Sequence, residues 1–300
     1  MLLAAGLGTR LRPYTLLRPK PLFPVLNRPL LLILIDMLQK AGCTKTIVNG
    51  HHLGHLIEET VKPLPDVSFQ DEPDILGTGG SLRQALREFS DEPILVMNGD
   101  IFHAVDLQGL YRQHISSGNI ITMAMHDYRR FNTVQVRDGR IVSFRPFRDV
   151  SDKELLAFSG IHVVEPDVLQ EIPRGRFYNI IDLYEHLARS GEKVGCVRID
   201  GDYWRDIGTP EDYLQLHEEL LSGKLGDAYP LPDLQGKWLV APHARIIDEV
   251  ELSGWGAIGN ADIGRNVSLK NCVVWDGACL EDGTRLENTI VAGPLRGALL

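Results

Sequence analysis

Apolar, strand-like segments alternate with amphipathic, helix-like segments along the first 117 residues, and this alternation restricts the possible folds more than any other feature. The strand-like segments are 1–5, 46–48, 66–70 and 93–97, and the helix-like segments are 30–41, 55–62, 79–89 and 107–117. Strands that are joined through helices pair in parallel, because a helical crossover returns the chain to the same end of the sheet. We therefore expect an α/β fold built on a mainly parallel sheet with helices on both faces.

A change of pattern at residue 120 indicates a subregion within the same domain. Short strand candidates follow one another at 120–125, 133–136, 141–144 and 158–164, and Asp138-Gly139 marks a hairpin turn. We expect this subregion, at about residues 120–205, to wall off one side of a ligand cleft. Residues 1–224 are thus interpreted as one domain with a Rossmann-like mixed sheet.

A second periodicity follows a proline-rich linker at 225–237. Apolar residues recur there about every six positions, at Val240, Ile246, Leu252, Ile258, Ile263, Leu269, Val274, Leu280 and Leu286. Six residues correspond to one side of a triangular coil, so residues 238–300 are predicted to form a hexapeptide-repeat, left-handed β-helix. We expect this short stack to pack on the first domain or on a neighbouring subunit, which makes a homo-oligomer through the β-helix possible.

The loop after the first strand concentrates positive charge in a chain whose formal net charge is −9. It contains no Asp or Glu, and its notable residues are Gly6, Gly8, Thr9, Arg10, Arg12, Arg18 and Lys20. Glycine allows backbone amides to approach an anion closely, and cations add attraction. Local basicity on an acidic protein indicates a small polyanion such as a nucleoside triphosphate, and it argues against nucleic acid or an anionic membrane as partner.

This loop is neither of the two common phosphate-binding loops. A dinucleotide-binding fingerprint needs a third glycine where Leu11 stands and a helix directly afterwards, whereas prolines follow here. The Gly-Lys-Ser/Thr sequence of a P-loop is also absent. Taken alone, the two glycines are equally compatible with an ordinary turn that carries solvated basic residues.

A carboxylate, Asp100, directly follows the apolar strand candidate at 93–97. Ligands of open α/β sheets bind beyond the carboxyl ends of the strands, so Asp100 suits a metal–phosphate site. An Asp in this place is also a common turn residue or helix cap. A second candidate, Asp206, precedes Thr209 and Pro210, which suit the first positions of a helix.

The opening of the chain resembles that of the sugar-1-phosphate nucleotidyltransferases, also called NDP-sugar pyrophosphorylases. The resemblance rests on the run from Leu2 to Pro13, on Arg18-Pro19-Lys20-Pro21-Leu22 and on Pro24-Val25. It implies that the glycine loop closes over the triphosphate and that Lys20 contacts phosphate at the reacting centre. The residues that it places at the nucleotide are Leu3, Ala5, Gly6, Gly8, Thr9 and Arg10. A few residues usually precede the apolar pair in this family, so we expect a start upstream of Met1.

Further segments extend the resemblance to the nucleobase and to the metal. Leu76-Gly77-Thr78-Gly79 resembles the family segment that lies against the base. Glu72 can accept hydrogen bonds from guanine N1–H and N2–H₂ and equally from uracil N3–H, so the base stays open. Asp100 and the aspartate of Trp204-Arg205-Asp206-Ile207-Gly208-Thr209-Pro210 match the family's Mg²⁺ ligands.

The sugar side matches the family less completely. Phe158-Ser159-Gly160-Ile161 resembles the segment whose glycine lets the sugar approach the backbone, and Asn179-Ile180-Ile181-Asp182-Leu183 resembles the next one. Many relatives carry Glu-Lys-Pro where this chain has Phe144-Arg145-Pro146, so the charge is kept but the usual sugar-hydroxyl contacts are in doubt. The predicted sugar-phosphate-binding residues are Asn98, Arg145, Gly160 and Asn179.

The implied reaction joins an NTP and a sugar 1-phosphate to give an NDP-sugar and pyrophosphate, with Mg²⁺ as cofactor. The implied catalytic residues are Arg10, Lys20, Asp100 and Asp206. The repeat tail and Leu-Gly-Thr-Gly-Gly favour a mannose- or heptose-1-phosphate guanylyltransferase, whereas Phe-Ser-Gly-Ile is also similar to N-acetylmuramate-1-phosphate uridylyltransferases. Uridylyl or thymidylyl transfer to another sugar 1-phosphate therefore stays an alternative.

Two other classes of protein fit the sequence less well. A non-catalytic regulatory homologue should have lost some of the four charged residues, and all are present. A glycosyltransferase usually carries Asp-x-Asp, but Asn98 stands here where the partner acid would be. Four cysteines without a C-x-x-C pair indicate reduced thiols, and the apolar run 30–35 is too short for a membrane span, so we expect a cytoplasmic protein.

Overall fold

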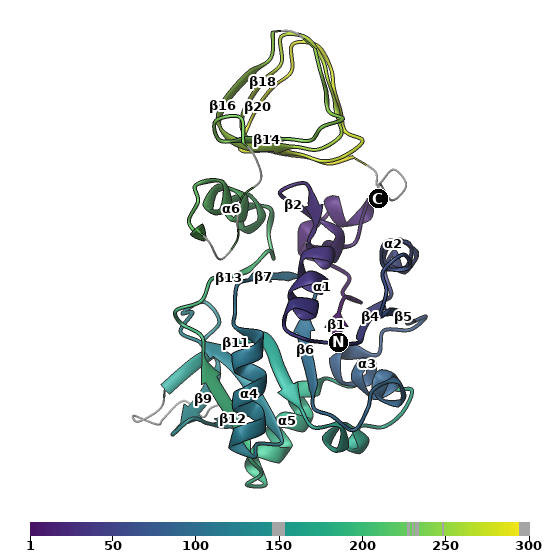
Figure 1. Ribbon diagram of the computed structural model, residues 1–300, viewed down its shortest axis with the longest axis vertical. Coiled ribbons are helices and arrows are strands. Elements are labelled where there is room, and N and C mark those ends of the chain that lie inside the picture. Colours follow the sequence, from purple (N-terminus) through teal and green to yellow (C-terminus); the bar gives the residue numbers. More distant parts are fainter. Residues whose placement is uncertain (146–153, 227–228, 230, 232–233, 248, 294–300) are drawn as a thin grey trace.

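The computed structural model describes residues 1–145, 154–226, 229, 231, 234–247 and 249–293. A large α/β part is capped at one end by a triangular coil of strands, with the N-terminal segment and helix α6 lying between them (Figure 1). The linker predicted at 225–237 is described only in part, and the last residues of the predicted repeat segment, 294–300, lie outside the described residues.

One mixed sheet forms the centre of the α/β part, in the order β5-β4-β1-β6-β11-β8-β12-β10-β9. Its strands are β1 Leu2–Leu3, β4 Thr46–Gly50, β5 Val67–Asp71, β6 Ile94–Asn98, β8 Ile121–His126, β9 Val134–Arg137, β10 Arg140–Ser143, β11 Glu154–Val164 and β12 Val194–Arg198. The run from β5 to β6 is parallel, whereas β11 pairs antiparallel with both β6 and β8. The predicted α/β fold with a mixed sheet is confirmed.

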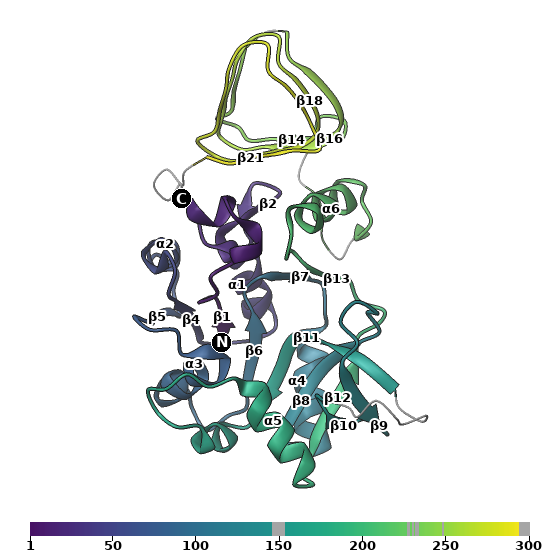
Figure 2. The ribbon, with the colours of Figure 1, turned by 180° about the vertical axis from the view of Figure 1, so that it is seen from behind.

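Helices cover both faces of this sheet, as predicted. On β6, Leu95 and Met97 belong to one core cluster and Ile94 and Val96 to the other, because successive side chains of a strand point to opposite faces. Helices α1 Leu30–Lys40, α2 Gly54–Val61, α4 Leu107–Ser117 and α6 Pro210–Leu221 contribute to the first cluster, and α3 Gly77–Ala85 and α5 Ile180–Arg189 to the second. Helix α4 is in front of the sheet in Figure 1, and α5 is in front in Figure 2.

The segment between β1 and α1 is irregular and proline-rich, as expected. It contains three one-turn 3-10 helices and a short strand pair, at Thr9–Leu11, Tyr14–Leu16, Lys20–Leu22, β2 Pro24–Val25 and β3 Arg28–Pro29. Leu11, Leu22 and Phe23 are buried, so this long loop is anchored in the core of the protein.

Several predicted boundaries differ from those of the structure, among them the end of the first strand and the start of helix α3. The first strand ends at Leu3 and not at residue 5, because the amide of Ala4 donates to the side chain of Asn49 (2.7 Å). Helix α3 begins at Gly77, two residues before the predicted start at 79. A Cβ on Gly80 would lie 2.6 Å from the carbonyl oxygen of Arg176, so a glycine is needed for this close packing.

The C-terminal strands form a coil in which corresponding residues are 17 positions apart, as in the parallel pairs Leu252↔Leu269 and Leu269↔Leu286. One sheet consists of β14 Trp238–Val240, β16 Glu251–Ile258, β18 Ser268–Val274, β20 Arg285–Glu287 and β21 Ile290–Val291, and another of β15 Arg245–Ile246, β17 Asp262–Ile263 and β19 Cys279–Leu280. The first sheet bends around a corner of the coil, because β20 pairs with the first half of β18 and β21 with its second half. Most of the predicted apolar positions face its interior. Ile246 is an exception: it is 38% exposed, because β15 is an edge strand.

Candidate active site

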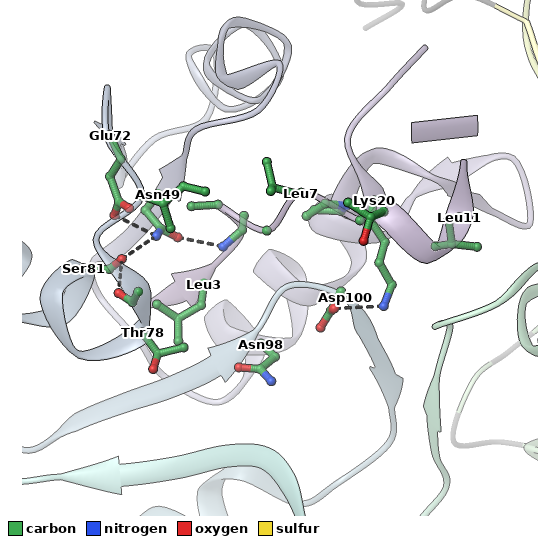
Figure 3. A pocket seen from close by; sticks show the side chains of 18 of the residues that line it. Leu3, Leu7, Leu11, Lys20, Asn49, Glu72, Thr78, Ser81, Asn98 and Asp100 are labelled. Carbon is green, nitrogen blue, oxygen red and sulfur yellow. Dashed lines mark hydrogen bonds and ion pairs between the residues drawn. The ribbon is translucent and has the colours of Figure 1, made fainter. Parts of the chain in front are cut away.

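A pocket of about 490 Å³ opens where the N-terminal loop, the start of α3 and the end of β6 meet. Its lining contains every predicted nucleotide-binding residue together with Lys20, Asn98 and Asp100 (Figure 3). The carboxyl ends of the neighbouring parallel strands β1 and β6 bring the loop and Asp100 to the same edge of the sheet. The structure therefore assembles residues that the sequence places far apart.

Lys20 and the two aspartates form a charged cluster at the inner end of this pocket. The Nζ of Lys20 donates to Asp100 Oδ2 (2.8 Å) and to Asp206 Oδ1 (3.0 Å), and Arg10 Nη2 lies 3.9 Å from Asp206 Oδ2. The side chain of Lys20 is only 6% exposed, whereas that of Asp100 is 39% exposed. The four predicted catalytic residues are thus brought together.

Strand pairing explains how Asp206 reaches Asp100. Asp206 ends β13 Trp204–Asp206, which pairs antiparallel with β7 Ile101–His103, and Asp206 lies opposite Ile101. Because Asp100 directly precedes β7, this register places the two carboxylates side by side. A Cβ on Gly208 would lie 2.6 Å from Asp206 Oδ2, so the glycine leaves room for this carboxylate.

Gly8 and Gly6 shape the N-terminal loop in different ways. Gly8 has φ +60°, and a Cβ there would lie 2.7 Å from Thr15 Cγ2, so any side chain would strain the turn. A Cβ on Gly6 would meet open space, so this glycine leaves the backbone accessible from the pocket.

A buried polar network surrounds Glu72 at the other end of the pocket. Glu72 Oε1 accepts hydrogen bonds from Asn49 Nδ2 (2.8 Å) and from Gln70 Nε2 (2.9 Å), and Asn49 also donates to Ser81 Oγ (3.0 Å) (Figure 3). The second carboxylate oxygen, Oε2, is buried and has no hydrogen-bond partner among the described residues. A buried acceptor without a partner points to a hydrogen-bond donor on a ligand.

Asn49, Gln70 and Ser81 were not predicted from the sequence. Asn49 lies at the carboxyl end of a predicted strand, which is the same signal that singled out Asp100. Gln70 and Ser81 carry no comparable signal, because their role depends on contacts between β5 and α3.

The predicted sugar-phosphate residues do not all lie at the pocket. Gly160 has φ +81° and packs against Asn98, since a Cβ there would lie 2.6 Å from Asn98 Nδ2. Asn179 caps α5 and lies beside Thr78, whose hydroxyl is 3.4 Å from Asn179 Oδ1. Arg145 does not line the pocket: its Nη2 pairs with Asp182 Oδ1 (2.6 Å), and its side chain is 70% exposed.

An aromatic cluster flanks Asp206 on the side of Gly160. Trp204 and Asp206 are two residues apart on β13, so their side chains share one face of the strand. Trp204 Nε1 donates to Ser159 O (2.8 Å), and its ring lies 4.5 Å from that of His126 and 5.4 Å from that of Tyr128. Burial lowers the pKa of His126, which favours the neutral ring in this cluster. Sequence reasoning did not identify Tyr128, because its loop matches no motif.

Comparison with known proteins identifies the family of the chain and agrees with its fold. The family model described as nucleotidyl transferase matches residues 1–223, so the chain belongs to the nucleotidyl transferase family. This confirms the family predicted from the N-terminal motif. No helix among the described residues combines the length and the apolar character needed to cross a membrane.

Individual relatives differ in the base that their names specify. The chain is 29% identical to a mannose-1-phosphate guanylyltransferase of Mycobacterium tuberculosis, over 96% of this chain and 82% of that protein. It is 28% identical to a UTP–glucose-1-phosphate uridylyltransferase of Synechocystis, over 98% of this chain and 87% of that protein. A crystal structure of HddC from Yersinia pseudotuberculosis in complex with GMP-PN shares the fold, with a TM-score of 0.60, 23% identity and coverage of 73% and 97% of the two chains.

Proposed function

We propose that the protein transfers a nucleotidyl group from an NTP to a sugar 1-phosphate, with guanylyl transfer to a mannose-1-phosphate-like acceptor as the preferred form. The observation that carries this proposal is the cluster of Lys20, Asp100 and Asp206 at the end of a pocket lined by the glycine loop. Two relatives are named as nucleotidyltransferases that act on a sugar 1-phosphate. All four charged residues of the proposed centre are present in this chain.

The chemistry needs positioning and charge stabilisation more than proton transfer. A phosphate oxygen of the sugar 1-phosphate is ionised at neutral pH and attacks the α-phosphorus in line. The bond from the α-phosphorus to its bridging oxygen breaks, and pyrophosphate leaves with the electron pair. Lys20 and Arg10 would neutralise the phosphate oxygens, and the open backbone at Gly6 would allow the triphosphate to approach.

The two aspartates fit a magnesium site. Mg²⁺ in phosphoryl-transfer enzymes is usually held by one or two carboxylates together with substrate phosphates. Asp100 and Asp206 already share one cation, the ammonium of Lys20, so their geometry suits a positive charge between them. When bound, Mg²⁺ would polarise the α-phosphate and offset the charge of the departing pyrophosphate.

Glu72 would bind the base through a hydrogen bond, and the aromatic cluster would contact the sugar. The buried Oε2 of Glu72 needs a donor, which guanine supplies through N1–H and N2–H₂ and uracil through N3–H. The rings of Trp204 and Tyr128 would pack against an apolar face of the sugar, since they lie beside Asp206 and Gly160.

Pyrophosphate release in the presence of Mg²⁺ tests the proposal, with GTP, UTP, dTTP, CTP and ATP each paired with mannose, glucose and N-acetylmuramate 1-phosphate. We expect release with GTP and mannose 1-phosphate. Release only with UTP or dTTP would favour the alternative uridylyl or thymidylyl transfer, and no release with any pair would favour a non-catalytic homologue. A thermal-shift panel of the same nucleotides reports binding independently of turnover.

We further propose the domain division 1–224 and 238–300 and a left-handed β-helix of the hexapeptide-repeat type for the C-terminal coil. The 17-residue spacing of its parallel pairs supports a coil with three sides of about six residues. Cytoplasmic location and self-association through this coil are also proposed, and sedimentation of the purified full chain would measure the second.

A further inference from the structure

The C-terminal coil inserts one large side chain behind the loop that carries Lys20. Trp275, directly after β18, is fully buried, although it belongs to the coil. Its ring lies 4.7 Å from that of Phe23, and the guanidinium carbon of Arg18 lies 4.5 Å from its centroid. The coil therefore contacts the loop two residues before Lys20 and three residues after it.

Hydrogen bonds fix this contact on both sides of Lys20. Trp275 Nε1 donates to the hydroxyl of Tyr213 (3.1 Å), and that hydroxyl donates to the carbonyl oxygen of Pro24. Arg18 Nη2 donates to the carbonyl oxygen of Gly293 in the coil (3.2 Å). Both ends of the segment from Arg18 to Pro24 are thus held, one by the coil directly and one through α6.

Arg18 is buried, although charged side chains are seldom fully buried in proteins. Its side chain is fully buried, it makes no ion pair among the described residues, and its Nε has no hydrogen-bond partner there. Burying a charge is costly, and among the described residues the face of Trp275, the Gly293 carbonyl and the more distant charge of Asp276 offset this cost. Burial also lowers the pKa of Arg18. The coil thus holds, through Arg18, a loop whose next cation, Lys20, lines the pocket.

We propose that Trp275 and Arg18 are positioning residues for Lys20. Through them, the C-terminal coil holds the loop that places Lys20 in the catalytic centre. The inference rests on the proposed function, because it takes Lys20 as the cation that meets the phosphates. Lys20 reaches Asp100 and Asp206 at hydrogen-bond distance, and a displacement of about 1 Å at a reacting centre can cost up to ~100-fold in rate.

The test compares Trp275→Leu with Leu269→Ala in the full chain. Leu269 is fully buried in the interior of the coil and belongs to a core cluster without Arg18, Phe23 or Trp275, so Leu269→Ala loosens the coil without touching the loop. Kinetics are measured below the unfolding temperature of both variants. We expect Trp275→Leu to lower kcat with the preferred NTP by roughly 30-fold, Trp275→Phe by much less, and Leu269→Ala not at all.

Amide hydrogen exchange across residues 9–25 gives a readout that does not depend on activity. We expect faster exchange in Trp275→Leu than in Leu269→Ala without any substrate. Equal kcat and equal loop exchange in these two variants would overturn the proposal. If Trp275→Leu does not fold, Arg18→Met, which keeps the apolar bulk, is compared with the same control.

Failure of the proposed function has a different signature. A wild-type protein that releases no pyrophosphate with any nucleotide would refute that function, and the exchange comparison would still decide whether the coil holds the loop. An active wild type, an inactive Lys20→Met and an unaffected Trp275→Leu would refute the positioning role alone.

Discussion

Replacing Glu72 by Gln separates its proposed role in binding the base from a role in stability, because the two effects have opposite signs. Glu72 is 1% exposed, Oε1 already accepts from Asn49 and Gln70, and Oε2 has no partner among the described residues. In Glu72→Gln the amide oxygen must keep the two donors, so the amide nitrogen takes the position of Oε2. A donor then faces the N–H groups of the base.

The magnitudes follow from hydrogen-bond energetics. A hydrogen bond to a charged group contributes about 1.5–3 kcal/mol, so the KM or Kd for the preferred nucleotide should rise about 10- to 150-fold. Loss of a buried carboxylate that has no cation partner should raise the unfolding free energy by about 1 kcal/mol. For a protein of this size that corresponds to roughly 2 °C in Tm.

Calorimetric nucleotide titration and thermal unfolding measure both effects. The matched control is Glu88→Gln, the same substitution at an exposed carboxylate paired with Lys45, which should change neither quantity appreciably. Nucleotide affinity within threefold of wild type together with a lower Tm would show that Glu72 is structural and would refute this reasoning.

Three further predictions follow from the charged cluster and the buried histidines. Asp100→Ala should abolish turnover and leave the far-ultraviolet circular dichroism spectrum unchanged; an active, folded variant would refute its role as a metal ligand. Lys20→Met should lower kcat by about 10²- to 10³-fold, by analogy with the loss of one preorganised stabilising group, and residual activity near wild type would contradict it. Burial lowers the pKa of His103 and of His217 to about 4, so the unfolded state binds their protons first as pH falls. The contribution of these neutral rings to the free energy of unfolding is complete above pH ~6.5 and is lost as pH falls toward 4. At pH 5 the loss should be about 2 kcal/mol for each ring. Denaturant unfolding at pH 8 and at pH 5 would measure it.

Much of the architecture could be predicted because it is encoded locally. The alternation of strands and helices, the irregular proline-rich loop and the cap of α6 by Thr209 all depend on residues a few positions apart. The same holds for Asp100, since the carboxyl end of an apolar strand is visible in the sequence. The boundaries of β1 and α3 could not be placed, because the first depends on a contact with Asn49 and the start of α3 is held by backbone hydrogen bonds with Tyr178.

The composition of the pocket shows what depends on distant contacts. The hydrogen bonds of Glu72 come from β4 and β5, and the neighbourhood of Asp206 comes from the register of β13 on β7. Arg145, predicted from the sequence as a phosphate ligand, pairs with Asp182 on α5, a contact that the sequence does not specify. Pairings of this kind are set by how whole elements pack, and no local pattern specifies them.

The sequence by itself determined the order of the elements, the family and the cationic loop with its glycines, because periodicity and motif are properties of neighbouring residues. Only the tertiary structure decided that Lys20 lies between Asp100 and Asp206, that one oxygen of Glu72 is left without a partner, and that Trp275 lies behind the loop. The physical reason is that burial and hydrogen-bond satisfaction are settled when the sheet, the helices and the coil pack together.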